Sequence, residues 1–297
     1  MIRVTLLGTS GSLPTVTRQM PAVALVHEGD TFLFDCGEGT QSQMLKYGVN
    51  IFRIRAIFLS HVHGDHIIGI AGLVRTLALQ GRKEPLRIFI PQGGEGIVRS
   101  LIVFDRAIIN YPIEIKGVRP GEVYKGKDFT VSAFRLEHTA PTLGFVFKEN
   151  DRRRFMTDKA KALGLRGTMF SELQKKGRLR VKGRIVTLSS ITTLQTGKKV
   201  AYATDTRPTK ETIAAARGAD LLIHEAAYSD REAELAKQRK HSTSREAAQV
   251  AKKAKAVQLI LTHISARHKT AAQLLKEARE AFKNVLAPDD GFTIEIR

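Results

Sequence analysis

The stretch Ser60-His61-Val62-His63-Gly64-Asp65-His66 decides the interpretation of this chain. Three histidines and an aspartate fall within six residues, directly after the apolar run RIRAIFL and before the helical pattern HIIGIAGLVRTLAL. Imidazole and carboxylate groups suit zinc-like divalent metals, and Gly64 lets the backbone turn so that several side chains converge. His61 and His63 can share one metal, which leaves Asp65 and His66 to face a second.

Three further candidate ligands follow predicted strands later in the chain. His138 ends FTVSAFRLEH, Asp205 ends VAYATD and His263 ends LILTH. Each is a weak signal alone, because a single His after a strand is commonly hydrogen-bonded or exposed and a single Asp there is often a helix cap. Together with the first cluster they make seven ligands, enough for two metals if Asp205 bridges. Two metals about 4 Å apart form a hydrolytic centre suited to phosphate esters.

Short apolar, β-branched runs alternate with helical patterns along the chain, which indicates an α/β protein. The spacing of Thr243 and Glu246 predicts a capping box at the start of a helix, so His241 would precede a helix N-terminus, a favourable place for an anion. Thr270 is expected to cap another helix. The expected strands are IRVTLLG, AVALVHEG, TFLFDCG, RIRAIFLSH, LRIFIP, IEIKGV, FTVSAFRLEH, KKVAYATD, DLLIHEA, VQLILTH and FTIEIR.

Charge is concentrated in one part of the sequence. The 297 residues contain 48 Lys+Arg and 29 Asp+Glu, a formal net charge of +19. Residues 151–200 hold 14 Lys+Arg and 3 Asp+Glu, and therefore +11 of that charge. This segment would attract a polyanion such as a nucleic acid, with strong salt dependence. A basic face with no partner is the alternative.

The remaining composition narrows the class of protein. The single cysteine, Cys36, excludes an internal disulfide and fits a reducing cytosol. The N-terminus lacks the pattern of a signal peptide, and the longest apolar stretch, residues 67–74, is too short to span a bilayer. We therefore expect a soluble cytoplasmic protein without a membrane partner.

The motifs together resemble the ribonuclease Z family of the metallo-β-lactamase superfamily, from residue 5 to about residue 268. They are LLGTSGSLPT, FDCGEGTQ, SHVHGDHIIG, HT at 138–139, TDTRP, HEA, HST and LTHISAR. The resemblance implies an αββα four-layer sandwich with a protruding basic arm, in a single domain (1–297) with a tRNA-binding arm inserted at about 150–195. It also implies two zinc ions per subunit, a homodimer, and removal of the 3′ trailer from precursor tRNA to leave a 3′-hydroxyl. Mn²⁺ or Fe²⁺ could occupy the same ligands.

Roles can be assigned to individual residues on this basis. His61, His63 and His138 would hold the first metal, Asp65, His66 and His263 the second, with Asp205 between them. The resemblance gives Asp65 the further role of general base. His241, poised by Glu225, is the candidate for protonating the leaving 3′ oxygen, because a carboxylate on one ring nitrogen favours the protonated ring; a phosphate contact without proton transfer is the alternative.

Other residues are expected to contact the substrate or to orient the metal ligands. Asp35 and Glu38 could orient ligating histidines, and Cys36 is expected to be a buried thiol. Arg267 could bind a phosphate through two hydrogen bonds, while His224 could equally be structural. The basic segment, with Arg178, Arg180 and Lys182 among its cations, would meet tRNA phosphates.

Two other functions remain open at this point. The same metal centre could act on a small substrate, as a phosphodiesterase or another metallo-β-lactamase-fold hydrolase, which would not need the basic segment. A nucleic-acid-binding module without catalysis is the third possibility, although such a protein would gain nothing from Asp65 and Asp205.

Overall fold

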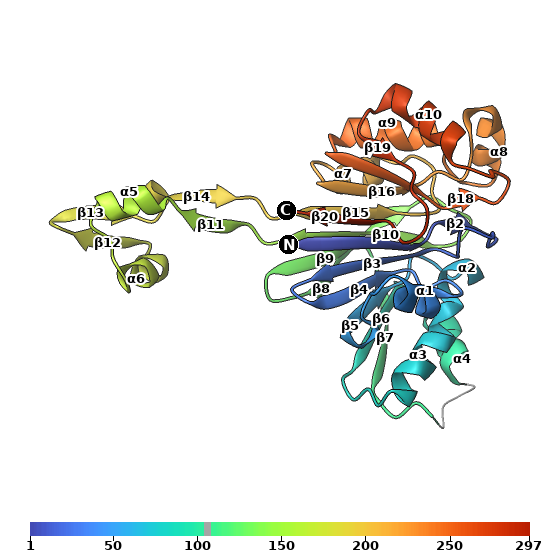
Figure 1. Ribbon diagram of the computed structural model, residues 1–297, viewed down its shortest axis with the longest axis horizontal. Helices are drawn as coiled ribbons and strands as arrows, with labels where there is room; N and C mark the ends of the chain where they lie inside the picture. Colours follow the sequence, from blue (N-terminus) through green and yellow to red (C-terminus); the bar gives the residue numbers. More distant parts are fainter. Residues whose placement is uncertain (104–107) are drawn as a thin grey trace. The chain divides into compact units, whose positions relative to one another are not determined.

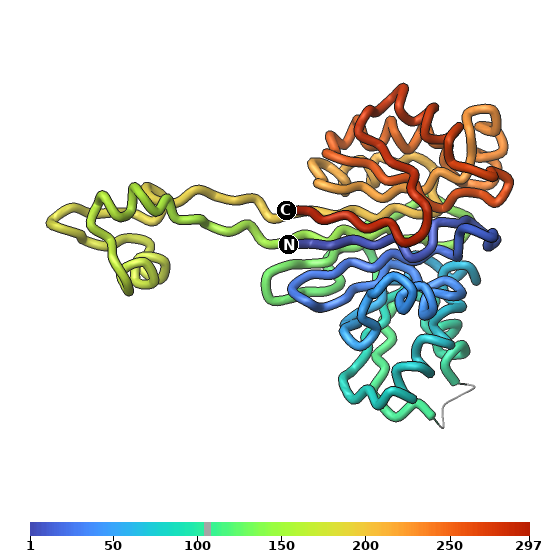
Figure 2. Tube along the Cα trace, in the orientation of Figure 1, coloured from blue at the N-terminus to red at the C-terminus, as the bar shows by residue number. Residues whose placement is uncertain are grey.

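The chain begins and ends in the same sheet. Strand β1 (Ile2–Gly8) pairs antiparallel with β20 (Thr293–Ile296), so the two termini lie side by side (Figure 2). The computed structural model describes residues 1–103 and 108–297. It contains two compact units: Met1–Lys148 with Lys198–Arg297, and Glu149–Gly197.

The first unit is built on two seven-stranded sheets. In sheet one the strand order is β20, β1, β3 (Ala22–His27), β4 (Asp30–Phe34), β5 (Ile54–Phe58), β6 (Leu86–Pro91) and β7 (Ile113–Val118). In sheet two it is β19 (Val285–Leu286), β17 (Gln258–Thr262), β16 (Leu221–Glu225), β15 (Lys199–Ala203), β10 (Thr142–Glu149), β9 (Phe129–Leu136) and β8 (Gly121–Lys125). Strands β4 to β7 run parallel, as do β15, β16, β17 and β19.

Alternation along the strands explains why the sheets stack between two layers of helices. On β4, Phe32 and Phe34 enter the core between the sheets, whereas Leu33 faces the helices on the other side of sheet one. On β15, Tyr202 enters the same central core and Ala201 faces the helices of sheet two. Successive side chains of a strand point to opposite faces, so a strand buried on both faces is apolar throughout. The predicted αββα four-layer arrangement is confirmed (Figure 1).

Helices cover the outer face of each sheet (Figure 1). Sheet one packs against α1 (Thr40–Lys46), α3 (Gly69–Leu79) and α4 (Glu95–Val103), and sheet two against α7 (Lys210–Ala215), α9 (Ser244–Ala254) and α10 (Ala272–Ala281). Shorter elements of this unit are β2 (Ser10–Gly11), β18 (Ile264–Ser265), α2 (Gly64–Ile67), α8 (Ala233–Gln238), η1 (Ile51–Arg53) and η3 (Asp230–Glu232).

One of the two predicted helix caps is confirmed and the other is wrong. Thr243 and Glu246 form the capping box that opens α9. Helix α10 instead has Ala271 as its N-cap, without a side-chain cap. The helix therefore begins one residue later than the Thr270 cap predicted.

The second unit has its own small core. Strands β11 (Arg152–Phe155) and β14 (Thr192–Gln195) pair, as do β12 (Arg178–Val181) and β13 (Arg184–Thr187). Helices α5 (Thr157–Ala162) and α6 (Met169–Lys176) and the turn η2 (Ser189–Ile191) complete it. Its buried cluster includes Leu165, Leu173 and Val181. The segment predicted as an insertion, at about 150–195, lies within this unit.

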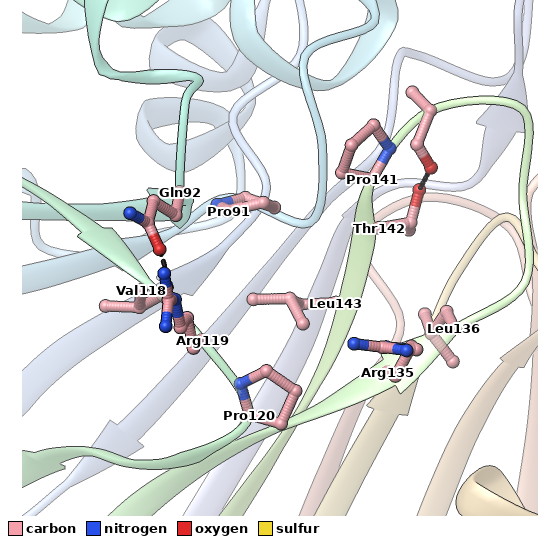
Figure 3. A pocket seen from close by; sticks show the side chains of 11 residues that line it. Pro91, Gln92, Val118, Arg119, Pro120, Arg135, Leu136, Pro141, Thr142 and Leu143 are labelled. Carbon is pink, nitrogen blue, oxygen red and sulfur yellow. Dashed lines mark hydrogen bonds between the residues drawn. The ribbon is translucent and has the colours of Figure 1, made fainter.

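A cleft opens in the first unit at the edge formed by β7, β8 and β9 (Figure 3). Its lining comes from the end of β6, the turn between β7 and β8, the end of β9 and the segment that leads into β10. None of the helices in the described part of the chain is long and apolar enough to cross a membrane.

Candidate metal centre

The seven predicted ligands follow the carboxyl ends of strands from both sheets. His61, His63, Asp65 and His66 come after β5, and His138 follows β9. Asp205 and His263 follow β15 and β17. Because β15 and β17 run in the same direction in sheet two, their following loops meet at one edge, where polar side chains converge without interrupting the core.

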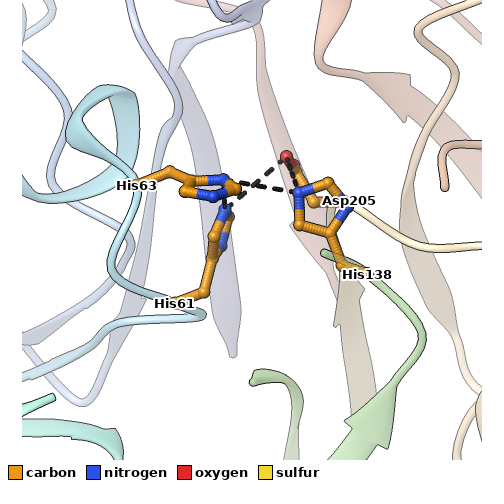
Figure 4. Close-up of side chains that lie close together, drawn as sticks. All are labelled: His61, His63, His138 and Asp205. Carbon is orange, nitrogen blue, oxygen red and sulfur yellow. Dashed lines mark hydrogen bonds and ion pairs between the residues drawn. The ribbon is translucent and has the colours of Figure 1, made fainter. Parts of the chain in front are cut away.

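One group of ligand atoms gathers around His63 (Figure 4). His63 Nδ1 lies 2.9 Å from His61 Nε2 and 3.3 Å from His138 Nε2. Asp205 Oδ2 lies 3.7 Å from His61 Nε2 and 3.6 Å from His138 Nε2. These four residues are close enough to hold one metal ion.

A second group gathers on the other oxygen of Asp205. Its Oδ1 lies 3.1 Å from His263 Nε2 and 3.4 Å from His66 Nε2. Asp65 Oδ2 lies 3.4 Å from the same atom of His66 and 3.5 Å from His263 Nε2. Asp65, His66 and His263 form a second set able to hold a metal ion. The structure therefore brings all seven candidates together and places Asp205 between the two sets.

The donor atoms fit a divalent cation. His66 Nε2 and both ring nitrogens of His263 are buried without a hydrogen-bond partner among the described residues. An unsatisfied buried polar group costs about 1–3 kcal/mol, and a bound cation would satisfy it. Burial, aided by the neighbouring His66, holds the pKa of His61 well below its ordinary value, and burial likewise lowers the pKa of His138. Both rings are thus kept neutral, the form that binds a metal.

Both carboxylates of the centre are ionised. Burial opposes their ionisation, but His263 and His66 hold the pKa of Asp205 well below its ordinary value. The imidazoles of His263 and His66, which lie 3.5 Å and 3.4 Å from Asp65 Oδ2, likewise lower the pKa of Asp65 against the effect of burial. Two ionised carboxylates at the centre of the cluster attract a positive ion.

Asp35 holds His66 from behind, as predicted for a residue that orients a ligand. Asp35 Oδ2 lies 2.8 Å from His66 Nδ1, which fixes the ring so that Nε2 faces the centre. Ser60 donates to both oxygens of Asp35, from its amide at 2.7 Å and its hydroxyl at 2.9 Å. Tyr202 adds a hydrogen bond to Oδ2 at 2.7 Å from the opposite sheet.

Glu38, the other residue predicted to orient a ligand, has no such role. Its side chain is exposed and makes no hydrogen bond or ion pair with the described residues. The chain turns there because Gly37 packs against the backbone of Asp65 and Gly39 adopts a positive φ of 80°. The turn directs Glu38 to solvent.

His241 and Glu225 form a pair beside the ligands. His241 Nδ1 lies 2.8 Å from Glu225 Oε1, and Glu225 also accepts a hydrogen bond from the amide of Thr206 at 2.6 Å. Although burial opposes a charged ring, Glu225 raises the pKa of His241 to about 9. The His241 ring centroid lies 4.9 Å from that of His138 and 5.4 Å from that of His263. A protonated imidazole therefore borders both ligand sets.

Arg267 and His224 have local partners. Arg267 donates to Glu232 Oε1 at 3.1 Å and lies over the Tyr228 ring, 5.0 Å from its centroid. Tyr228 in turn contacts His241. His224 is buried, with Nδ1 2.7 Å from the backbone oxygen of Glu225, which fits the structural role left open for it.

The three predicted tRNA-binding cations of the second unit lie on one hairpin. Arg178 and Arg180 are exposed on β12, while Leu179 and Val181 between and after them turn to the core of the unit. Lys182 and Gly183 form the turn, both with positive φ, the conformation of a two-residue hairpin loop. The thiol of Cys36 is buried, as predicted.

Sequence reasoning missed two contributors. The backbone amide of Ser12, whose φ is 61°, donates to Asp65 Oδ2 at 3.0 Å. Tyr202 reaches Asp35 from the facing sheet. The motif LLGTSGSLPT could have pointed to Ser12, whereas nothing around Tyr202 in the sequence distinguishes it from a core aromatic residue.

Comparison with known proteins places this arrangement in a family. The metallo-β-lactamase superfamily model matches residues 17–263. The ribonuclease Z of Methanosarcina acetivorans is 40% identical over 300 residues, which cover 100% of this chain and 98% of the relative. That of Gemmatimonas aurantiaca is 42% identical and covers 99% and 95%. This chain belongs to the ribonuclease Z family.

A solved structure agrees with this membership. Human tRNase Z, short form, matches with a TM-score of 0.74 and 28% identity, covering 99% of each chain. In the ribonuclease Z family, as in the wider superfamily, the metallo-β-lactamase fold together with this His/Asp cluster indicates a divalent metal.

Proposed function

We propose that this protein is a zinc-dependent endoribonuclease that removes the 3′ trailer from precursor tRNA and leaves a 3′-hydroxyl on the tRNA. The observation that carries the proposal is the position of Asp205, with one oxygen toward each ligand set and the His241–Glu225 pair alongside. A phosphodiester bound across two metals needs such a bridging carboxylate and a nearby proton donor. Membership in the ribonuclease Z family supports the choice of RNA as substrate.

Two zinc ions would each take one ligand set and share Asp205. Bound there, they would polarise the scissile phosphate and lower the pKa of an attacking water. Mn²⁺ or Fe²⁺ would suit the same nitrogen and oxygen donors. The proposed holders are His61, His63, His138 and Asp205 for one ion, and Asp65, His66, His263 and Asp205 for the other.

The chain's own side chains would move the protons. The hydrogen bond and both ion pairs described for Asp65 use Oδ2, so Oδ1 is the oxygen that would accept a proton from the attacking water. His241 would donate a proton to the departing 3′ oxygen of the tRNA. Glu225 fixes the ring through Nδ1, which leaves Nε2 to act as donor.

Recognition of the tRNA would rest on the exposed cations of the second unit. Arg178, Arg180 and Lys182 would contact phosphates. Such contacts recognise folded RNA by its backbone and shape rather than by its bases. The family resemblance further supports a homodimer. The single buried Cys36 is compatible with a cytoplasmic protein.

Cleavage of a 3′-extended precursor tRNA, with added zinc or manganese, tests the proposal. The wild type should cut near the trailer junction and Asp65→Ala should not. The triple variant Arg178→Ala/Arg180→Ala/Lys182→Ala should raise KM for the tRNA about tenfold or more and reduce the salt dependence of binding. The triple variant Lys252→Ala/Lys253→Ala/Lys276→Ala removes the same charge from exposed positions on α9 and α10 and should behave as wild type.

The opposite result would favour the alternative function. If the wild type leaves the precursor whole but hydrolyses bis(p-nitrophenyl) phosphate, and the Arg178 triple variant does so equally well, the protein is a small-molecule phosphodiesterase or related hydrolase instead.

A further inference from the structure

The cleft at the edge of β7, β8 and β9 takes no part in the chemistry described above. Its volume is about 400 Å³, within the range of roughly 300–1,000 Å³ typical of ligand sites. Arg119 and Arg135 line it, and its lining contains no aspartate or glutamate. Figure 3 shows the two arginines on either side of Pro120 and Leu143. Such a cleft combines positive charge with flat apolar surfaces.

The two guanidinium groups are available to an anion. The Arg135 side chain is exposed and makes no hydrogen bond or ion pair with the described residues. Arg119 donates to the neutral amide oxygen of Gln92, so its charge is not neutralised. Guanidinium groups match the geometry of phosphate oxygens, and proline and leucine surfaces can pack against a nucleobase. This chemistry suits single-stranded RNA, whose unstacked bases and phosphates are both exposed.

The cleft adjoins the loops that carry the candidate ligands. The amide of Leu143 donates to the backbone oxygen of Ser60 at 2.9 Å, and Ser60 directly precedes His61. Ala140 and Pro141 of the lining lie on the segment that carries His138. A strand of RNA cut at the metal centre would therefore enter the cleft within a short distance of the cut.

Sheet topology gives the direction of that strand. In sheet two the order is β16, β15, β10, β9 and β8. Glu225 ends β16, where His241 contacts it, and Asp205 follows β15. The cleft lies at the end of β9 and just before the start of β8. The tRNA nucleotide whose 3′ oxygen departs would lie at His241, so the RNA beyond the cut would run the opposite way along this edge.

We propose that the Arg119–Arg135 cleft binds the first nucleotides of the trailer, on the 3′ side of the cut. The inference rests on the proposed function and adds a second contact region on the same substrate. Productive binding then depends on trailer length. A one-nucleotide trailer carries no phosphate beyond the scissile one, whereas a five-nucleotide trailer presents several phosphates to the two arginines.

Cleavage of precursor tRNAs with one- and five-nucleotide trailers tests this. We expect the wild type to have a higher kcat/KM for the longer trailer, and Arg119→Ala/Arg135→Ala to reduce that preference about tenfold or more. The salt dependence for the longer trailer should also weaken, by a slope of about 0.7 for each phosphate that the double variant no longer binds. Lys127→Ala, which removes an exposed charge from the far end of the β8–β9 hairpin, should keep the wild-type preference.

The outcomes separate the two proposals. If the wild type does not cut either precursor, the proposed function fails. If it cuts both, but the double variant keeps the wild-type trailer preference or loses activity equally on both substrates, the cleft does not bind the trailer. Thermal unfolding followed by circular dichroism checks that the double variant is folded. Arg119→Lys/Arg135→Lys, which keeps the charge but not the planar fork, should recover part of the preference.

Discussion

Replacing Tyr202 by phenylalanine tests whether the facing sheet helps to hold the metal centre. The Tyr202 hydroxyl donates to Asp35 Oδ2 at 2.7 Å, and Asp35 holds His66 through the same oxygen. Tyr202 and Asp35 are both fully buried, so water cannot replace the missing donor. A hydrogen bond to a charged group contributes about 1.5–3 kcal/mol, and we expect the free energy of unfolding to fall by about 2 kcal/mol. Loosening a residue that orients a ligand typically lowers metal affinity about tenfold or more.

Tyr111→Phe is the matched control. The Tyr111 hydroxyl is also buried, but it joins the segment before β7 to helix α3 by donating to the neutral backbone oxygen of Val74 at 3.1 Å, and neither residue contacts a ligand. Its removal should cost about 1 kcal/mol and leave metal affinity unchanged. Urea unfolding of the chelator-treated proteins measures stability, and zinc titration against a competing chelating dye measures affinity. Equal stability losses in the two variants, with zinc affinity unchanged in both, would refute the idea that Tyr202 acts through Asp35.

Three further predictions concern the same region. Gly11→Ala should weaken zinc binding and cleavage at least tenfold, because an added Cβ would lie 2.6 Å from His263 Nδ1 and 2.9 Å from the backbone oxygen of His263. Gly96→Ala on α4 is the control. An added Cβ there meets nothing within 4 Å, so this variant should be neutral or stabilising. Burial raises the pKa of the Cys36 thiol to about 12, so Ellman's reagent at pH 8 should leave the native protein unmodified and modify one thiol per chain in urea. Excess zinc over chelator-treated protein should raise the melting temperature by on the order of 10 °C in calorimetry, because the ion binds only the folded ligand sets; no shift would mean that these residues do not bind zinc.

The strand pattern and the ligand spacing could be predicted because both are local. The ligands near His61 follow one another in the sequence. His138, Asp205 and His263 each come directly after an apolar run, and in α/β folds the loops that follow strands carry the functional side chains. Strand β10 gave no such signal. Its sequence, TLGFVFKE, begins with Thr142 and has Gly144 inside the apolar run, and a glycine there weakens the pattern of a strand.

The helices and strands of the basic segment could not be predicted from the sequence either. Its helices and strands are four to eight residues long, too short for a helical or strand period to stand out. Its core is nonetheless well defined, because Leu165, Leu173 and Val181 from separate elements meet in one cluster. A helical or strand period can be recognised only when the element is long enough to repeat it. An insertion made of short elements therefore resembles a loop in the sequence.

Glu38 and Tyr202 show why the surroundings of a site are harder to predict than its ligands. Glu38 stands in a motif with Asp35, yet the turn at Gly37–Gly39 sends it to solvent. Tyr202 stands in an ordinary buried strand, yet stacking of the two sheets brings its hydroxyl to Asp35. A ligand must carry one of a few donor groups, so residue type and spacing limit the choice. A residue that holds a ligand in place needs only a hydrogen bond from the right direction. Here tertiary packing sets that direction, between two residues that are 167 positions apart in the sequence.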